Sequence, residues 1–173
     1  MVHTLDRYID NGVSIKWPND IYWNDRKICG ILVEHSLSGG KIDHTIAGIG
    51  LNINQEKFLS DAPNPVSLRQ IIGCDTPLPD VLHHLSEELL RLADSLPDNA
   101  ESLHAEFLSR LYRRNGLHTY RNVADRTADH LAAGEEFCAE IADVASDGIL
   151  TLARPDGSRP RFAFKEVEFV IGK

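Results

Sequence analysis

Apolar and polar residues alternate along the first fifty residues as they do in β-strands. The alternating runs cover residues 13–17, 21–23, 27–35 and 42–54. The dipeptide Asn24-Asp25 and the tripeptide Ser38-Gly39-Gly40 separate the later runs, and these residues favour the positive φ of tight turns. Residues 4–11 instead have helical spacing and end at Gly12, which predicts a helix capped by that glycine. Four strands in succession favour a largely antiparallel sheet.

The pattern is helical between residues 64 and 112. A short helical stretch is expected around residues 67–72, within "VSLRQIIG", and ends at Gly73. A leucine stripe then recurs at helical spacing, with Asp80 as the predicted N-cap, and a second helix is expected over residues 100–112. The stripe consists of Leu82, Leu85, Leu89 and Leu92. We expect it to lie in the core, with the helices covering one face of the sheet.

Strand patterns return from about residue 118. The runs "EFCAEIADV", "GILTLAR" and "RFAFKEVEFVI" are separated by turns containing Asp-Gly, a spacing typical of a small all-β barrel. The sequence therefore predicts an α+β fold with two domains. Residues 1–117 form a mixed, largely antiparallel sheet covered by helices, and residues 118–173 form a small β-barrel.

Composition narrows the class of protein. The chain has 173 residues, 42% of them hydrophobic, and a formal charge of −8, which argues against a broad nucleic-acid or anionic-membrane surface. No apolar run reaches the roughly 18 residues that a membrane helix needs. The three cysteines are far apart and form no CxxC pattern, so neither a zinc site nor a disulfide framework is predicted. We expect a cytoplasmic protein.

One strand combines a lysine with an otherwise apolar run. In "KICGILVE", alternation places Lys27 and Cys29 on one side of the strand and Gly30 on the other. A buried strand tolerates an ammonium when an anion meets it. Gly48 and Gly50 share a face of the next strand and leave a trough, because glycine inside a strand often marks the close approach of a ligand.

The turn before this strand adds an amide and a carboxylate. Asn19 and Asp20 precede Lys27 by a few residues, so the lysine, the trough and the turn together indicate a site for an anionic small molecule. Each feature also has a simpler interpretation. Lys27 alone would be a solvated lysine at a strand edge, Asn19 and Asp20 could close a turn, and the glycines could mark a bulge.

The compound motif resembles a known family. "KWPNDIYWNDRKICGILVE", followed by "GIGLNIN" and "PVSL", is similar to the catalytic core of biotin protein ligases, and the order of elements along nearly the whole chain agrees. The resemblance implies a partial catalytic domain of the class II synthetase-like type, followed by an SH3-like barrel. It also implies a reaction in which biotin and MgATP form biotinyl-5'-adenylate, which then acylates a lysine of a biotin carboxyl carrier protein.

The resemblance also implies roles for individual residues. Lys27 would be the catalytic ammonium and would bind biotin together with Gly30, Gly48 and Gly50. The ATP and adenylate side would be formed by three polar residues, namely Asn19, Asp20 and Asn52, with Asp20 the expected partner of Mg²⁺. ATP and Mg²⁺ are thus the implied cofactors, and biotin is the substrate.

The sequence departs from the family pattern before "KWPND". Family members carry there a loop of the form GRGRxGRxW, which this sequence lacks, and the arginines Arg7 and Arg26 stand alone. We therefore interpret the chain as the C-terminal part of a ligase, with no DNA-binding segment. Two alternatives stay open: a non-catalytic remnant or binding module with this fold, and a lipoate protein ligase. Half a sheet leaves an exposed hydrogen-bonding edge, which predicts a homodimer.

Overall fold

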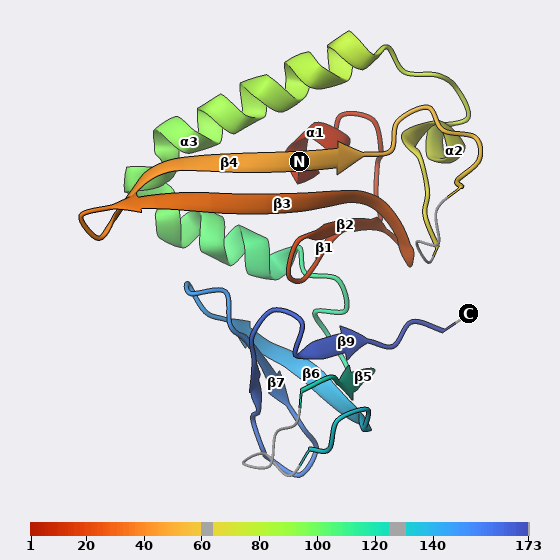
Figure 1. The fold of residues 1–173 in the computed structure, drawn as a ribbon. Helices are drawn as coiled ribbons and strands as arrows, with labels where there is room; N and C mark the ends of the chain where they lie inside the picture. The colour runs from red at the N-terminus through yellow and green to blue at the C-terminus, as the bar shows by residue number, and fades with distance from the viewer. Residues whose placement is uncertain (60–63, 125–130, 173) are drawn as a thin grey trace. The chain divides into compact units, whose positions relative to one another are not determined.

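The structure is a computed structural model that describes residues 1–59, 64–124 and 131–172. It divides the chain into two compact units, residues 1–100 and residues 101–173, each of which contains its own antiparallel sheet (Figure 1). The predicted domain boundary near residue 117 falls in the link between a long helix and the second sheet, and it stays a prediction. None of the helices in the described part of the chain has the length and apolar character that crossing a bilayer requires.

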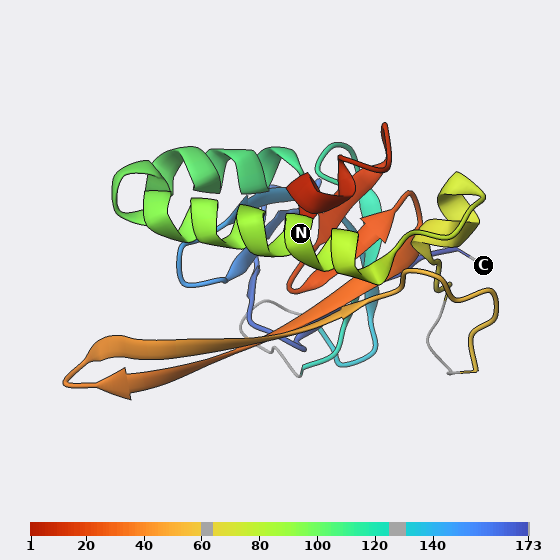
Figure 2. The ribbon, with the colours of Figure 1, turned by 90° about the horizontal axis from the view of Figure 1, so that it is seen from above.

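The first unit is built on a four-stranded antiparallel sheet in the order of the sequence. Its strands are β1 (Val13–Lys16), β2 (Asp20–Trp23), β3 (Arg26–Ser38) and β4 (Lys41–Leu51). The predicted turns are confirmed, since Asn24 has a φ of 50° and Gly39 and Gly40 also have positive φ. β3 and β4 form a long hairpin that projects beyond β1 and β2 (Figure 2).

Three helices accompany this sheet: α1 (Val2–Leu5), α2 (Leu68–Ile72) and α3 (Leu78–Ser109). α2 ends at Gly73 as predicted, with this glycine in the left-handed conformation, and Ser67, where the helical piece was expected to start, is its N-cap. The prediction for α1 was wrong, because the helix ends before Asp6. Gly12 therefore does not cap this helix, and its lack of a side chain has another reason. At its φ of 85°, a Cβ atom would stand 2.8 Å from Oδ1 of Asn24 and would also crowd the ring of Trp23.

The two predicted helices after residue 80 form one element with a kink. α3 runs from Leu78 to Ser109 and has non-helical backbone angles at Asn99. The predicted N-cap, Asp80, lies inside the first turn of the helix rather than before it. An acidic side chain there still favours the helix, because it faces the positive end of the helix dipole.

The leucine stripe of α3 is exposed, which corrects the prediction that it lies in the core. Leu82 is 64% exposed and Leu89 55% exposed, while Leu85 and Leu92 are half-buried. The side chain of α3 that is buried in the protein is instead that of Val81, which is 2% exposed. The polar contacts of α3 with α1 lie near that side, so the leucines point away from the buried side.

The core of the first unit lies between α1, the sheet and α2. Its fully buried members include Leu5, Ile28, Val66 and Leu68. Arg7, which follows α1, pairs with Glu87 and Glu88 of α3 at 3.3 and 3.2 Å. The start of the chain is therefore held on one side by apolar packing and on the other by ion pairs.

The second unit is a five-stranded antiparallel sheet in the order β8-β7-β6-β5-β9. Its strands are β5 (His118–Asn122), β6 (Glu136–Val144), β7 (Leu150–Ala153), β8 (Arg161–Phe162) and β9 (Val167–Phe169). Aromatic rings fill its core, and Tyr120 meets Phe169 edge-on with ring centroids 4.9 Å apart. β8 and β9 do not pair with each other within the described residues, so the SH3-like barrel stays a prediction.

Candidate functional site

A β-bulge at the start of β3 sets the position of Lys27. In the pairing with β2, Tyr22 lies opposite Lys27 and Ile21 opposite Cys29, so Ile28 is an extra residue. A bulge of this kind breaks the alternation of side chains. Ile28 and Cys29 are consequently both buried, and the prediction that Lys27 lies opposite to Gly30 was wrong: the lysine shares the face of Gly30.

Lys27 forms an ion pair with Asp20 on that face. The Nζ atom lies 2.7 Å from Oδ1 of Asp20, and the side chains are 34% and 17% exposed. Gly30 makes room for this pair, because a Cβ atom on Gly30 would stand 3.2 Å from Nζ of Lys27 and 3.4 Å from Oδ1 of Asp20. The pair shows where an anionic oxygen meets the ammonium, and its partial exposure leaves it open to exchange with a ligand.

Asn19 fixes the turn that carries Asp20. Its Nδ2 donates a hydrogen bond to the carbonyl oxygen of Ile31 at 2.7 Å, and its own carbonyl accepts one from the Ile31 amide at 2.8 Å. The Trp17–Pro18 peptide bond before it is cis, and Trp17 is buried. The side-chain amide of Asn19 thus holds the turn on β3, and its predicted contact with ATP stays a prediction.

The predicted glycine trough extends from Gly30 along the same face. Gly30 lies directly opposite Gly50 in the β3–β4 ladder, and Leu32 lies opposite Gly48. A Cβ atom would meet nothing closer than a backbone oxygen, at 3.8 Å for Gly48 and 3.7 Å for Gly50. Crowding within the protein therefore does not require glycine at these two positions. The absence of side chains there would allow a ligand to approach the backbone closely.

The "PVSL" segment holds the backbone of the site. The amide of Lys27 donates to the carbonyl of Asn64 at 3.0 Å, and the amide of Val66 donates to the carbonyl of Lys27 at 2.9 Å. Asn52 donates its side-chain amide to the carbonyl of Val66 at 3.2 Å. The three parts of the compound motif thus meet at Lys27. The side-chain amide of Asn52 is bonded to the protein backbone, and its predicted contact with the adenylate stays a prediction.

One charged residue beside the Lys27–Asp20 pair was not predicted to belong to the site. Lys16 is the pairing partner of Asp20 across β1 and β2, and its Nζ lies 5.4 Å from the ring centroid of Tyr22. A second ammonium therefore stands beside the Lys27–Asp20 pair. The signal was present in the sequence, since Lys16 is the first residue of "KWPND".

The chemistry of the face is electrostatic rather than nucleophilic. Burial raises the pKa of the Cys29 thiol to about 12, so the thiol of this buried residue stays protonated at neutral pH. In the part of the chain that the structure describes, no group of three His, Cys, Asp or Glu side chains could hold a metal ion. The predicted role of Asp20 as a partner of Mg²⁺ stays a prediction.

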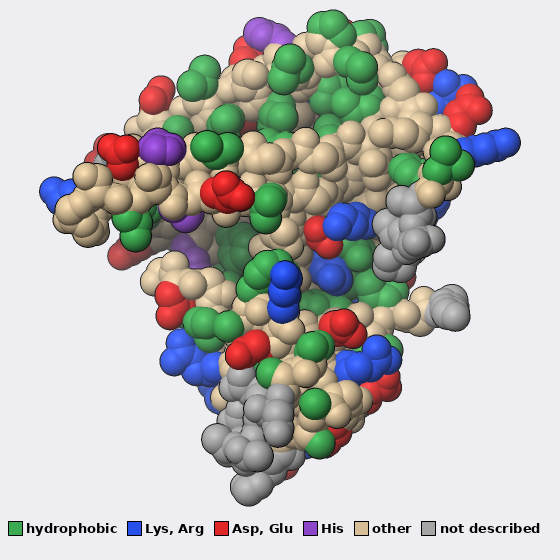
Figure 3. Space-filling model, in the orientation of Figure 1, with side chains coloured by type: hydrophobic (Ala, Val, Ile, Leu, Met, Phe, Trp, Pro, Cys, Tyr) green, Lys and Arg blue, Asp and Glu red, His purple; other side chains and the backbone are tan. Residues whose placement is uncertain are grey.

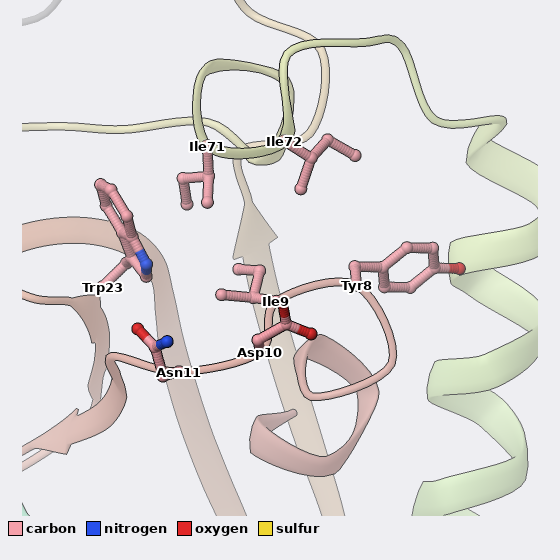
Figure 4. A pocket seen from close by; sticks show the side chains of 7 residues that line it. All are labelled: Tyr8, Ile9, Asp10, Asn11, Trp23, Ile71 and Ile72. Carbon is pink, nitrogen blue, oxygen red and sulfur yellow. The ribbon is translucent and has the colours of Figure 1, made fainter.

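A separate cavity lies on the other face of the sheet. Trp23 alternates with Asp20 along β2 and packs on the core side. It lines an open cavity of about 340 Å³ together with Tyr8, Ile9, Asp10, Asn11, Ile71 and Ile72 (Figure 4). This cavity borders the core beside α2, so it does not form part of the Lys27 site.

Comparison with protein families and curated relatives agrees with the motif. Residues 1–52 match the model of the biotin/lipoate A/B protein ligase family. The chain is similar to the bifunctional ligase/repressor BirA of Escherichia coli, with 40% identity over 64 residues, or 37% of this chain and 20% of that protein. It is also similar to biotin–protein ligase 2 of Arabidopsis thaliana, with 27% identity over 86% of this chain and 46% of that protein. The chain spans less than half the length of these relatives.

Solved structures share the fold over nearly the whole chain. The apo biotin protein ligase of Aquifex aeolicus has a TM-score of 0.73 at 18% identity and covers 99% of this chain and 71% of its own. The same ligase in complex with biotin and ATP has a TM-score of 0.71. The predicted resemblance to biotin protein ligases and the antiparallel α+β architecture are therefore confirmed.

Proposed function

We propose that this chain supplies the lysine-bearing part of a biotin protein ligase active site. Its match to the biotin and lipoate ligase family provides the starting point. The observation that carries the proposal is the Lys27 ammonium, held 2.7 Å from a carboxylate oxygen at one end of a face on which Gly30 and Gly50 lie opposite each other. A carboxylate-bearing ligand with a flat body could lie on these glycines and place its anion at Lys27.

The reaction would use this ammonium twice. In the first step, a carboxylate oxygen of biotin attacks the α-phosphorus of ATP, a new P–O bond forms, and pyrophosphate leaves. Negative charge gathers on both reacting groups, and a fixed ammonium lowers the barrier for such a step. In the second step, the amine of a carrier-protein lysine attacks the acyl carbon of biotinyl-5'-adenylate, which the ammonium would polarise; the amide bond forms, AMP leaves with the electrons of the broken acyl–oxygen bond, and the attacking nitrogen gives up a proton to solvent.

Asp20 and Lys16 would balance the charges of the Lys27 ammonium and of the ATP phosphates. Asp20 occupies the anion position at Lys27 when no ligand is bound, so it keeps the lysine in place until a carboxylate or phosphate replaces it. It would then be available to Mg²⁺ on the ATP phosphates. Lys16, which stands beside Asp20, would balance a second phosphate charge. The partner that receives biotin would be a biotin carboxyl carrier protein.

The proposal is tested by isotope exchange between pyrophosphate and ATP. The purified chain is incubated with biotin and MgATP, alone and with the region of the E. coli ligase that precedes the equivalent of "KWPND", and each component is also measured alone. We expect exchange in the mixture and its loss, by at least about a hundredfold, with Lys27→Gln. Lys57→Gln, which changes a lysine outside the site, is the matched control.

The two rival functions give different results in the same assay. A non-catalytic binding module would show no exchange under any condition, and that result would overturn the proposal. A lipoate ligase would exchange with lipoate in place of biotin. This second candidate is worth testing because the matching family model covers both kinds of ligase.

A further inference from the structure

Large apolar side chains are exposed along the first part of α3. We call them the leucine face, which consists of Leu78, Leu82, Leu89 and Leu96. Their exposed fractions are 56%, 64%, 55% and 53%. Leu85 and Leu92 lie between them and are half-buried. A helix that packs on its own sheet buries such a stripe. An exposed stripe instead indicates contact with another polypeptide segment.

The spacing of these leucines indicates a helical partner. From Leu78 to Leu96, the steps along the stripe alternate between four and three residues, which is the heptad spacing of helices that pack side by side. The small residues Ser86 and Ala93 flank the stripe and allow close approach. The acidic residues Asp80, Glu87 and Asp94 recur every seven residues on the opposite side of the helix, so the contact surface itself is nearly uncharged.

Strands β3 and β4 form a second side of this surface, next to α3. Hydrophobic side chains gather along α3 and in the hollow between α3 and β4 (Figure 3). Val33, on the core face of β3, is 47% exposed and lies opposite Ala47 of β4. The core of the first unit thus continues from its buried members into an open apolar groove.

The shape of the groove argues against a second copy of this chain. A twofold interface places the same patch of both copies against each other, so the patch must be complementary to itself. Two copies would each have to place α3 in the hollow of the other, while α3 already forms one side of its own hollow (Figure 3). The Aquifex ligase shares the fold across 99% of this chain, yet only 71% of that ligase is matched, so more than a quarter of its chain has no counterpart here.

We infer that the leucine face and the adjoining face of β3 and β4 form the docking surface for an amphipathic helix of a complementary ligase segment. The occupant carries apolar residues at heptad spacing and few charges along the contact. The inference rests on the proposed function, because the segment would be the one that completes the active site. It adds where that segment binds and by which side chains.

Binding can be measured without any enzyme activity. The E. coli ligase region that precedes the equivalent of "KWPND" is labelled with a fluorophore, and its affinity for the chain is determined by fluorescence anisotropy. We expect the double variant Leu82→Gln with Leu89→Gln to weaken binding at least about tenfold. Both residues are more than half exposed, so circular dichroism should show an unchanged fold.

Two controls make the result specific. Leu117→Gln removes a leucine that is 59% exposed in the second unit and should bind the segment like the unchanged chain. Raising the salt concentration from 0.1 to 0.5 M should change the affinity less than about twofold, because the flanks of the surface are uncharged and screening acts on exposed charges.

Three results would overturn the inference: full binding by the double variant, equal loss with Leu117→Gln, or no binding of the segment together with a homodimer that the double variant abolishes. The last result would assign the surface to a second copy. A failure of the proposed function would look different, since the segment would then bind and lose affinity in the double variant, while no pyrophosphate exchange appeared.

Discussion

At the scale of single residues, the site depends on a glycine that leaves space for an ion pair. A Cβ atom on Gly30 would stand 3.3 Å from Cε of Lys27 and 3.4 Å from Oδ1 of Asp20. Contacts this short require the neighbours to move. The lysine is flexible and half-exposed, so the protein can relax by shifting Lys27, but the shift moves the ammonium from its place over the strand.

Gly30→Ala should therefore reduce activity more than stability. We expect the free energy of unfolding to fall by less than about 1 kcal/mol, as for surface changes that the structure can absorb, and biotin-dependent exchange in the completed enzyme to fall at least about tenfold. Chemical denaturation and the exchange assay measure the two effects. Gly50→Ala is the matched variant: its Cβ meets only the Gly30 carbonyl, at 3.7 Å, so it should raise KM for biotin with little change in kcat. Equal behaviour of both variants would contradict this account.

The sequence identified the charged pair of the site but not its geometry. Lys27 and Asp20 were predicted to belong to one anionic site, and the structure places them 2.7 Å apart. The face of Lys27 was predicted wrongly, because alternation cannot reveal that Ile28 is an extra residue in the ladder. The engagement of Asn52 with a backbone carbonyl also depends on the "PVSL" segment, which is distant in sequence.

At the scale of elements, "PVSL" has a clear structural task. Ser67 caps α2: its Oγ accepts a hydrogen bond from the amide of Gln70 at 3.2 Å, and the side-chain oxygen of Gln70 accepts one from the Ser67 amide at 3.2 Å. The same hydroxyl donates to the carbonyl of Gln55 at 2.6 Å. α2 follows directly after the residues that hold Lys27, so the cap also supports the site.

Ser67→Ala should destabilise the first unit by about 1–2 kcal/mol, the range for loss of an N-cap, because it removes the cap and leaves a partly buried carbonyl without its donor. Thermal or chemical unfolding measures the loss. Ser86→Ala is a suitable control, since that exposed serine only donates to the preceding turn of α3 and its loss should cost less than about 0.5 kcal/mol. Equal effects of the two changes would show that the capping box contributes nothing.

The contact between α1 and α3 should weaken in acid. Hydrogen bonds from Arg91 and Arg7, opposed by partial desolvation, hold the pKa of the Glu88 carboxyl at about 2, below its ordinary value of 4.5. Stability from a lowered carboxyl pKa is fully present above 4.5 and is lost as the pH falls toward 2. The protection factors of the Leu5 and Asp6 amides, which are exchange rates corrected for the intrinsic effect of pH, should therefore fall between pH 4.5 and 2.

Glu88→Gln should remove most of this pH-dependent loss of protection, because the neutral side chain does not titrate. Asp94→Asn, on the same helix but without an ion pair among the described residues, should keep the loss of protection of the unchanged chain. An acid response that survives in Glu88→Gln would show that another group controls the contact.

The elements were predicted better than their packing. Four strands, the α2 caps and the hairpin turns follow from local chemistry, such as the positive φ of Asn24. The leucine stripe of α3 was assigned to the core because its period matches a buried helix face. Period alone cannot say whether the matching partner belongs to the same chain, and Leu82 is exposed here.

At the scale of the whole molecule, the sheet of the first unit has a long edge strand, β4, with one side unpaired among the described residues. β4 pairs only with β3 within the described residues, and its eleven residues, Lys41–Leu51, leave backbone groups that can pair with another strand. We expect the isolated chain to form a concentration-dependent dimer in sedimentation experiments. Ile46→Lys should weaken that dimer because a charge on an edge strand opposes pairing. A monomer at all concentrations would contradict this prediction.

We propose that the face bearing Lys27 and the glycines binds biotin by its carboxylate. The most direct measurement is a two-dimensional NMR titration of the isotope-labelled chain, completed with the ligase segment, with biotin and with biotinamide, which lacks the carboxylate. We expect biotin to shift the amide signals of Gly30, Gly48 and Gly50 and biotinamide to shift them far more weakly. Lys27→Gln should remove the difference between the two ligands. Shifts confined to Ile71 and Ile72 at the separate cavity, or equal responses to both ligands, would contradict this proposal.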